Sequence, residues 1–141
     1  MLDQRFYMSV HLMTALAFDG WEKGKLSPSE QLARSLKTNP TVVRRLIARL
    51  ADAGLLKAYK GKKGGVELAR CPDEVTLEDI YLASSENPGL LRAPKRSPRR
   101  QCPVSCSMGP LMKDVFEGVE RNSREYLRGW TLADLCQRVK G

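Results

Sequence analysis

Two helix-start signals lie close together in this sequence, and they constrain its fold more than any other feature. In residues 27–30 a serine at the expected N-cap is followed by a proline at the first helical position and by an acid three residues after the cap. Asn39 and Pro40 repeat the cap-and-proline pattern. The first helix is expected to end near Leu36, so the pattern predicts two helices joined by a tight turn.

The second of these helices has two chemically different faces. One face is apolar and predicts a buried stripe, and Gly54 follows as a stop signal. The other face is cationic. The buried stripe comprises Val43, Leu46, Ile47 and Leu50, and the cations are Arg44, Arg45 and Arg49. A helix that packs one face and exposes arginines on the other is typical of a helix-turn-helix, whose second helix enters the DNA major groove.

Residues 55–69 predict a β-hairpin directly after these helices. Short alternating segments flank a tip rich in glycine and lysine, where the turn needs positive φ angles. Lys60, Lys62 and Lys63 at this tip can reach phosphates beside the helix. The expected fold class is therefore mainly α with a small β-hairpin wing, that is, a winged helix-turn-helix domain.

The positive charge is confined to this region. Residues 34–63 contain nine lysines and arginines and one acid, a net charge of +8 that equals the formal charge of the whole chain. Charge concentrated on one segment favours a polyanionic partner such as double-stranded DNA. We expect DNA contacts from Ser27, Thr38, Asn39, Thr41, Arg44, Arg45, Arg49, Lys60, Lys62 and Lys63.

Three motifs resemble the Rrf-two family of bacterial winged helix-turn-helix transcription regulators. They are Gly54-Leu55-Leu56, then Lys60-Gly61-x-x-Gly64-Gly65-Val66-x-Leu68-Ala69-Arg70, then Val75-Thr76-Leu77-x-Asp79-Ile80. Lys60 replaces the usual arginine and Val66 the usual aromatic residue. The sequence is most similar to the branch that lacks an iron–sulfur cluster. The resemblance implies a dimeric, sequence-specific DNA-binding transcription regulator, most simply a repressor on a palindromic operator, and no enzymatic activity.

The family pattern also implies a homodimer held by a long helix near the C-terminus. The sequence predicts such a helix over residues 110–128, opened by Pro110, and Thr131 is expected to cap a last short helix. The expected dimer residues follow a 4-4-3-4 spacing: Leu111, Val115, Val119, Asn122 and Tyr126. The predicted domains are residues 1–84 for the winged domain, 85–109 for a flexible basic loop, and 110–141 for the dimerisation and C-terminal helices.

The predicted loop contains Cys102 and Cys106, our candidates for redox sensing. The neighbouring Arg99 and Arg100 favour the reactive thiolate. Two idle thiols, or control by a small effector, are alternatives. Cluster-binding members of the family place three cysteines here, whereas this chain has two, so we expect no cofactor and no metal site, with an iron–sulfur cluster as the alternative.

Other classes of protein are less compatible with the sequence. No apolar run approaches the ~20 residues that span a membrane, and no export signal is recognised, so we expect a cytoplasmic protein. A thiol oxidoreductase using Cys102 and Cys106 is one rival, but the Cys-x-x-Cys spacing is missing. A winged helix that binds RNA or another protein is the second rival.

Overall fold

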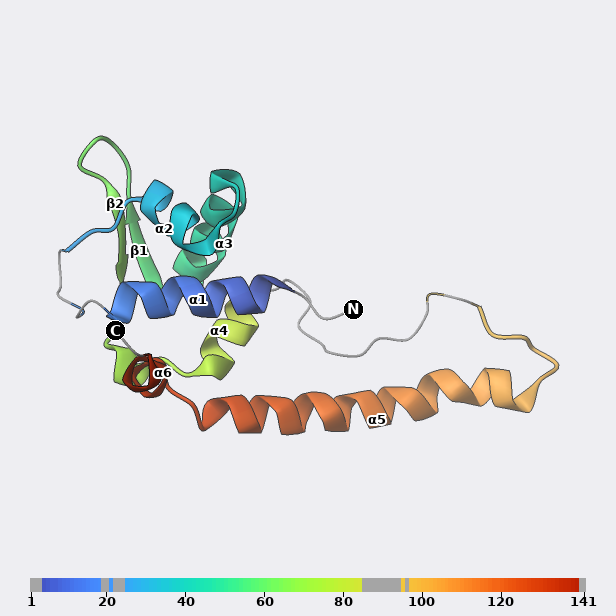
Figure 1. Ribbon diagram of the computed structural model, residues 1–141. Coiled ribbons are helices and arrows are strands. Elements are labelled where there is room, and N and C mark those ends of the chain that lie inside the picture. The colour runs from blue at the N-terminus through green and yellow to red at the C-terminus, as the bar shows by residue number, and fades with distance from the viewer. Residues whose placement is uncertain (1–3, 19–20, 22–24, 85–94, 96, 140–141) are drawn as a thin grey trace. The chain divides into compact units, whose positions relative to one another are not determined.

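The computed structural model describes residues 4–18, 21, 25–84, 95 and 97–139 (Figure 1). The chain divides into two compact units. The first, which we call the winged unit, contains residues 1–88 and 127–141, and the second contains residues 89–126. Among the described residues, no helix combines the length and the apolar character needed to cross a membrane.

The winged unit confirms the predicted winged helix-turn-helix. Helices α2 and α3 and the hairpin of β1 and β2 lie on one side of α1, and α4 and α6 lie on the other (Figure 1). The elements are α1 Gln4–Phe18, α2 Ser29–Leu36, α3 Pro40–Asp52, β1 Leu56–Tyr59, β2 Gly65–Leu68, the 3-10 helix η1 Pro72–Glu74, α4 Leu77–Ser84 and α6 Leu132–Arg138.

One hydrophobic core holds the winged unit together. Its members come from α1, α2, α3, α4 and α6 and from both strands. Fully buried side chains include Leu12, Met13, Val43, Leu50, Ile80 and Leu132. The predicted apolar stripe of α3 is confirmed, because all four of its residues are buried. Burial of this kind fixes which face of α3 remains available to a partner.

Both ends of α3 follow the prediction. The side-chain oxygen of Asn39 accepts a hydrogen bond from the Thr41 amide at 2.7 Å, so Asn39 caps the helix. At the other end Gly54 adopts a φ of 78°, and the Leu55 amide donates to the Leu50 carbonyl at 2.9 Å. This pair of features is the Schellman ending, which favours glycine.

The predicted N-cap role of Ser27 is wrong. Helix α2 begins at Ser29, with Pro28 in the cap position and no side-chain cap bond. The backbone of Ser27 instead pairs with Val66: the Ser27 amide donates at 2.9 Å and the Ser27 carbonyl accepts at 2.8 Å. A side chain at Gly65 would place its Cβ 2.8 Å from that carbonyl oxygen, so glycine allows this pairing. Pairing with β2 therefore takes Ser27 out of the helix start.

The hairpin has the predicted antiparallel form, with Leu56 opposite Leu68 and Tyr59 opposite Gly65. Its turn needs two glycines. Gly61 adopts a φ of 100°. A Cβ at Gly64 would lie 2.1 Å from the Tyr59 carbonyl oxygen, so any larger residue would force the turn open.

The long helix α5 spans Pro103–Arg128, so it begins seven residues before the predicted start at Pro110. Two local features explain the earlier start. Pro103 occupies the first helical position, and the Cys102 sulfur accepts a hydrogen bond from the Ser105 amide at 3.4 Å. Cys106 therefore lies in the helix, whereas the sequence placed it in a loop. The loop residues 85–94 and 96 lie outside the described part of the chain.

The C-terminal segment returns to the winged unit, which corrects its predicted grouping with the dimerisation helix. The Leu77 amide donates to the Trp130 carbonyl at 2.9 Å, and the Leu132 amide donates to the Val75 carbonyl at 2.8 Å. The predicted cap at Thr131 is confirmed as a reciprocal pair with Asp134. The guanidinium of Arg128 forms two hydrogen bonds to the Glu78 carboxylate, at 2.9 and 2.8 Å.

Candidate nucleic-acid interface

Helix α3 exposes part of its cationic face. The Arg44 and Arg45 side chains are exposed, as is Thr41, while Arg49 is half-buried. The arginines are held in this position because the opposite side of α3 forms part of the core. An exposed arginine on a rigid helix can bond a guanine edge or a phosphate bidentately. The prediction that these arginines face outward is thus confirmed for Arg44 and Arg45.

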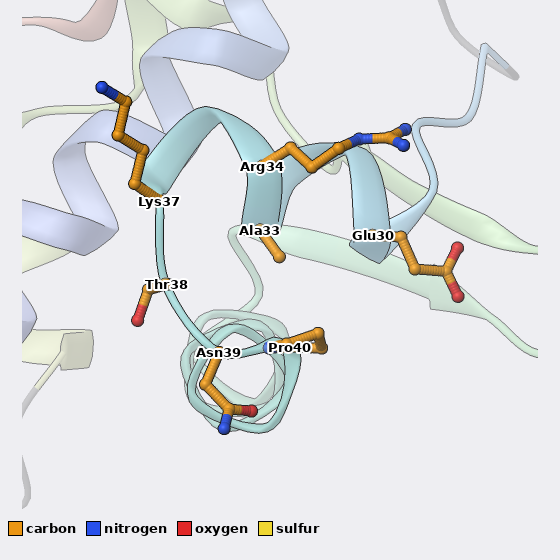
Figure 2. A pocket seen from close by; sticks show the side chains of 7 residues that line it. All are labelled: Glu30, Ala33, Arg34, Lys37, Thr38, Asn39 and Pro40. Atoms are coloured by element: carbon orange, nitrogen blue, oxygen red, sulfur yellow. The ribbon is translucent and has the colours of Figure 1, made fainter.

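The turn between α2 and α3 borders an open hollow of about 520 Å³ (Figure 2). Asn39 is exposed and Thr38 is half-buried. Because the Asn39 oxygen already caps the helix, its amide NH₂ group is the part available to an acceptor. The hollow is lined by Glu30, Ala33, Arg34, Lys37, Thr38, Asn39 and Pro40.

The wing presents three further cations on the same side of α1 as α2 and α3 (Figure 1). Lys60, Lys62 and Lys63 are all exposed around the tip. Ser27 is half-buried, and its backbone connects the wing to the segment before α2. The hairpin and the helix-turn-helix are therefore joined by backbone hydrogen bonds as well as by side-chain packing.

The electrostatics of this surface are strongly positive. Eight of the nine cations in residues 34–63 are exposed, and within the described parts of the chain none of these eight has a side-chain ion pair. Three of the eight carried no assigned role in the sequence prediction, although their charge marked them as candidates: Arg34, Lys37 and Lys57. A surface of unpaired cations suits a polyanion and is ill suited to an acidic-residue catalytic site.

The cysteines are all free thiols. Cys102 is half-buried and Cys106 is exposed, with its sulfur 3.5 Å from the Arg99 carbonyl oxygen and 3.7 Å from that of Arg100. A hydrogen bond with Asp73 raises the pKa of Cys71, and burial raises the pKa of Cys136, so both favour the thiol form. The described residues contain no cluster of three or more His, Cys, Asp or Glu that could bind a metal ion.

The expected dimer residues lie on α5, none of whose 26 residues is buried. Leu111 is 59% exposed, Val115 52% and Tyr126 69%. Because α5 starts early, Val104 and Met108 join the same stripe, which the sequence prediction missed. The full spacing is then 4-3-4-4-3-4, an eleven-residue repeat that passes from Val104 through Val115 to Tyr126.

Known proteins share this sequence pattern and fold. The Rrf2 (Rrf-two) family model, described as an iron-dependent transcriptional regulator, matches residues 2–138. YwnA of Bacillus subtilis, named as an HTH-type transcriptional regulator, is 30% identical over 139 residues, which cover 99% of each chain.

Two solved structures have similar folds. A transcriptional regulator from Lactobacillus plantarum is 25% identical, with a TM-score of 0.74 over 95% of this chain and 88% of the other. CymR, the global cysteine regulator of B. subtilis, has a TM-score of 0.71 over 99% of this chain and 98% of its own, and at 18% identity it supports the fold alone. These matches do not favour the thiol oxidoreductase or the RNA- or protein-binding module. The chain belongs to the Rrf2 family and is a DNA-binding transcription regulator.

Proposed function

We propose that this chain is a homodimeric repressor that binds a palindromic operator in the bacterial cytoplasm and catalyses no reaction. The observation that carries the proposal is the exposure of Arg44 and Arg45 on α3 and of the lysines at the tip of the wing, two elements that lie on the same side of α1 (Figure 1). A helix can enter the major groove while a neighbouring hairpin contacts the flanking phosphates or minor groove.

The proposed roles of the residues follow from their position. Arg44 and Arg45 contact base edges. Four neighbours contact the DNA around them: the exposed Thr41 and Asn39 and the half-buried Thr38 and Arg49. Lys60, Lys62 and Lys63 bind phosphates, and the backbone pairing of Ser27 with Val66 holds β2 in place close to the tip. Base contacts set sequence preference, whereas phosphate contacts add affinity for every duplex.

The second copy would pair along α5. Its 26 residues make a helix about 39 Å long at ~1.5 Å per residue, with an apolar stripe over its whole length. An eleven-residue repeat corresponds to about 3.67 residues per turn, which keeps such a stripe nearly straight. Pairing would bury Leu111, Val115, Val119, Asn122 and Tyr126, together with Val104 and Met108.

The experiment is a selection of bound duplexes from a random library, followed by gel shifts with the selected sequence. The selected site is expected to be a palindrome bound at least about 10³-fold more tightly than random duplex at equal salt. Equal affinity for both duplexes would contradict the proposal. A steep salt dependence by itself would not support it, because any basic protein has one.

Two variants separate the proposed roles. Arg44→Ala should weaken binding to the selected site by about 1–3 kcal/mol and relax its sequence preference. Lys62→Ala should weaken binding to the selected and random duplexes by a similar factor. It should also reduce the slope of log affinity against log salt concentration by about 1. Lys113→Ala, which removes an exposed lysine from α5, is the matched control. The reverse ordering of Arg44→Ala and Lys62→Ala would show that the roles are misassigned.

We also propose that thiol oxidation at Cys102 controls DNA binding. The Cys102 thiolate would attack one oxygen of hydrogen peroxide, which forms an S–O bond, breaks the O–O bond and releases hydroxide, and so gives a sulfenic acid. Attack on its sulfur by the Cys106 thiol, or by a thiol of the other copy, would then form a disulfide and release water. The Cys102 sulfur accepts a hydrogen bond from the Ser105 amide at the start of α5. Oxidation of this sulfur would remove the cap from the helix proposed to form the dimer.

An iron–sulfur cluster is not part of this proposal. Clusters are held by about four ligands, usually thiolates, whereas the start of α5 offers two, Cys102 and Cys106, and the Cys102 sulfur already caps the helix. Peroxide should release operator DNA from the wild type and leave the Cys102→Ser variant bound. Peroxide-induced release that persists in Cys102→Ser would exclude this thiol as the sensor. A visible absorption spectrum of a cluster after anaerobic purification would instead favour the iron–sulfur cluster as the sensor.

A further inference from the structure

The turn between α2 and α3 contains a lysine in a backbone conformation that lysine disfavours. Lys37 has a φ of 52° and a ψ of 45°, in the left-handed region. Among the described residues it is the sole non-glycine with a positive φ. Left-handed backbone brings the Cβ of an L-residue close to the following carbonyl oxygen, and residues other than glycine in this conformation cluster at functional sites.

The left-handed conformation is imposed by the turn. The Lys37 amide donates to the Arg34 carbonyl at 3.2 Å, and the Thr38 amide donates to the Ala33 carbonyl at 3.1 Å. These two bonds form a Schellman ending, in which the left-handed residue is most often glycine. Three residues then connect Leu36 to Pro40, so the chain must change direction sharply between α2 and α3 (Figure 2).

The same chain uses glycine where the same geometry recurs. Gly54 occupies the equivalent position after α3, with a φ of 78°. The nearest atom to a Cβ added there is 3.9 Å away, so the backbone angle, and not lack of space, explains the glycine. The turn after α2 is thus an exception, in which a long cationic side chain is kept where glycine would fit the backbone better.

Neighbouring contacts do not account for the lysine. A cation near a helix C-terminus interacts favourably with the helix dipole, but Arg34 already provides one in the last turn of α2. Lys37 is exposed, and in the described structure its ammonium group has no hydrogen-bond or ion-pair partner. Figure 2 shows the Lys37 and Arg34 side chains leaving α2 in opposite directions beside the start of α3.

We propose that Lys37 is a positioning residue that binds a DNA backbone phosphate next to the groove entered by α3. This inference rests on the proposed function, because it assigns a role within the same DNA-binding surface. Lys37 precedes the capping residue Asn39 by two positions and borders the same hollow. A phosphate bound there would fix the N-terminal end of α3, from which base-reading side chains project.

The test is the Lys37→Gly variant, measured in two ways on the full chain. Its Tm should be equal to that of the wild type or higher by up to about 4 °C, because glycine relieves the backbone strain. Its affinity for a labelled random 30-base-pair duplex should fall roughly five- to tenfold at ~0.1 M salt, with a log–log salt slope smaller by about 0.9 for each bound copy.

Two further variants make the test specific. Lys37→Arg keeps the charge and should retain the affinity, and Lys113→Ala removes an exposed lysine from α5 and should leave the affinity unchanged. Wild-type affinity and salt slope in Lys37→Gly would overturn the inference, as would a Tm below that of the wild type. If the wild type itself bound the selected operator and random duplex equally, the proposed function would fail instead, so the two failures are distinguishable.

Discussion

The winged unit and the long helix use apolar residues in opposite ways. In the winged unit, leucines such as Leu50 and Leu132 are fully buried by the chain's own elements. In α5 no residue is buried, and Leu111 and Val115 are more than half exposed. One part of the chain therefore carries its own core, whereas the apolar face of the other is available to a second polypeptide.

The largest expected effect is on the core of the winged unit. Leu50→Ala should lower the free energy of unfolding by about 2–5 kcal/mol, because it removes a buried side chain and leaves a cavity. Urea unfolding followed by circular dichroism measures this loss. A loss below about 1 kcal/mol would mean that the buried core does not hold the unit together, and the contrast with α5 would disappear.

The next effect concerns the place where α5 joins the winged unit. Glu78→Gln should lower the free energy of unfolding by about 1.5–3 kcal/mol, since it removes the charge from a pair of hydrogen bonds to Arg128 whose acceptor is largely buried. Arg70→Gln is the control: the Arg70–Asp79 pair is 4.0 Å long and partly exposed, so its loss should change the stability by less than about 1 kcal/mol. Equal effects of the two variants would show that the Arg128–Glu78 pair stabilises the unit no more than the partly exposed Arg70–Asp79 pair does.

On α5 itself the expected change is in association. Leu111→Ala should weaken dimerisation by about tenfold, or ~1.4 kcal/mol, which sedimentation velocity over a concentration series would measure. The unfolding free energy of the winged unit should change by less than about 0.5 kcal/mol, because Leu111 lies outside its core. A stable monomer that behaves identically with and without this substitution would show that the stripe pairs with nothing.

The smallest effect is a pH dependence within the winged unit. Hydrogen bonds from Thr131 lower the pKa of Asp134 below its ordinary range. A lowered folded-state pKa stabilises the fold above the unfolded-state pKa, and this contribution is lost as the pH falls through the folded-state pKa. As the pH is lowered from about 5 to about 3, the free energy of unfolding of Asp134→Asn should therefore fall by less than that of the wild type. Parallel pH profiles in urea unfolding would contradict the assignment.

Local rules explain what could be predicted from the sequence. The cap at Asn39, the stop at Gly54 and the glycine-rich hairpin each depend on a few adjacent residues, and all three are present in the structure. The arginines of α3 were predictable because helical periodicity separates Arg44 and Arg45 from the buried stripe. These features define the α3 and wing parts of the candidate interface.

Long-range pairing explains most of what could not be predicted. Serine is favoured at helix N-caps, but the backbone of Ser27 pairs with Val66, which lies far along the chain. The return of the C-terminal segment depends on hydrogen bonds to Val75 and to Leu77, the first residue of α4, which no local pattern encodes. The early start of α5 depends on a cap by the Cys102 sulfur, whereas the sequence pattern favours Pro110 as the first residue of the helix.

The closing of the core by the C-terminal segment has a consequence for synthesis of the protein on the ribosome. Leu132 is fully buried, and its amide is bonded to the Val75 carbonyl, so the winged unit cannot complete its core until α5 has already been made. A nascent chain thus reaches its DNA-binding fold only after the whole of α5 has emerged. Translation that stops within α5 would leave an incomplete core, which favours degradation of the truncated chain over its accumulation.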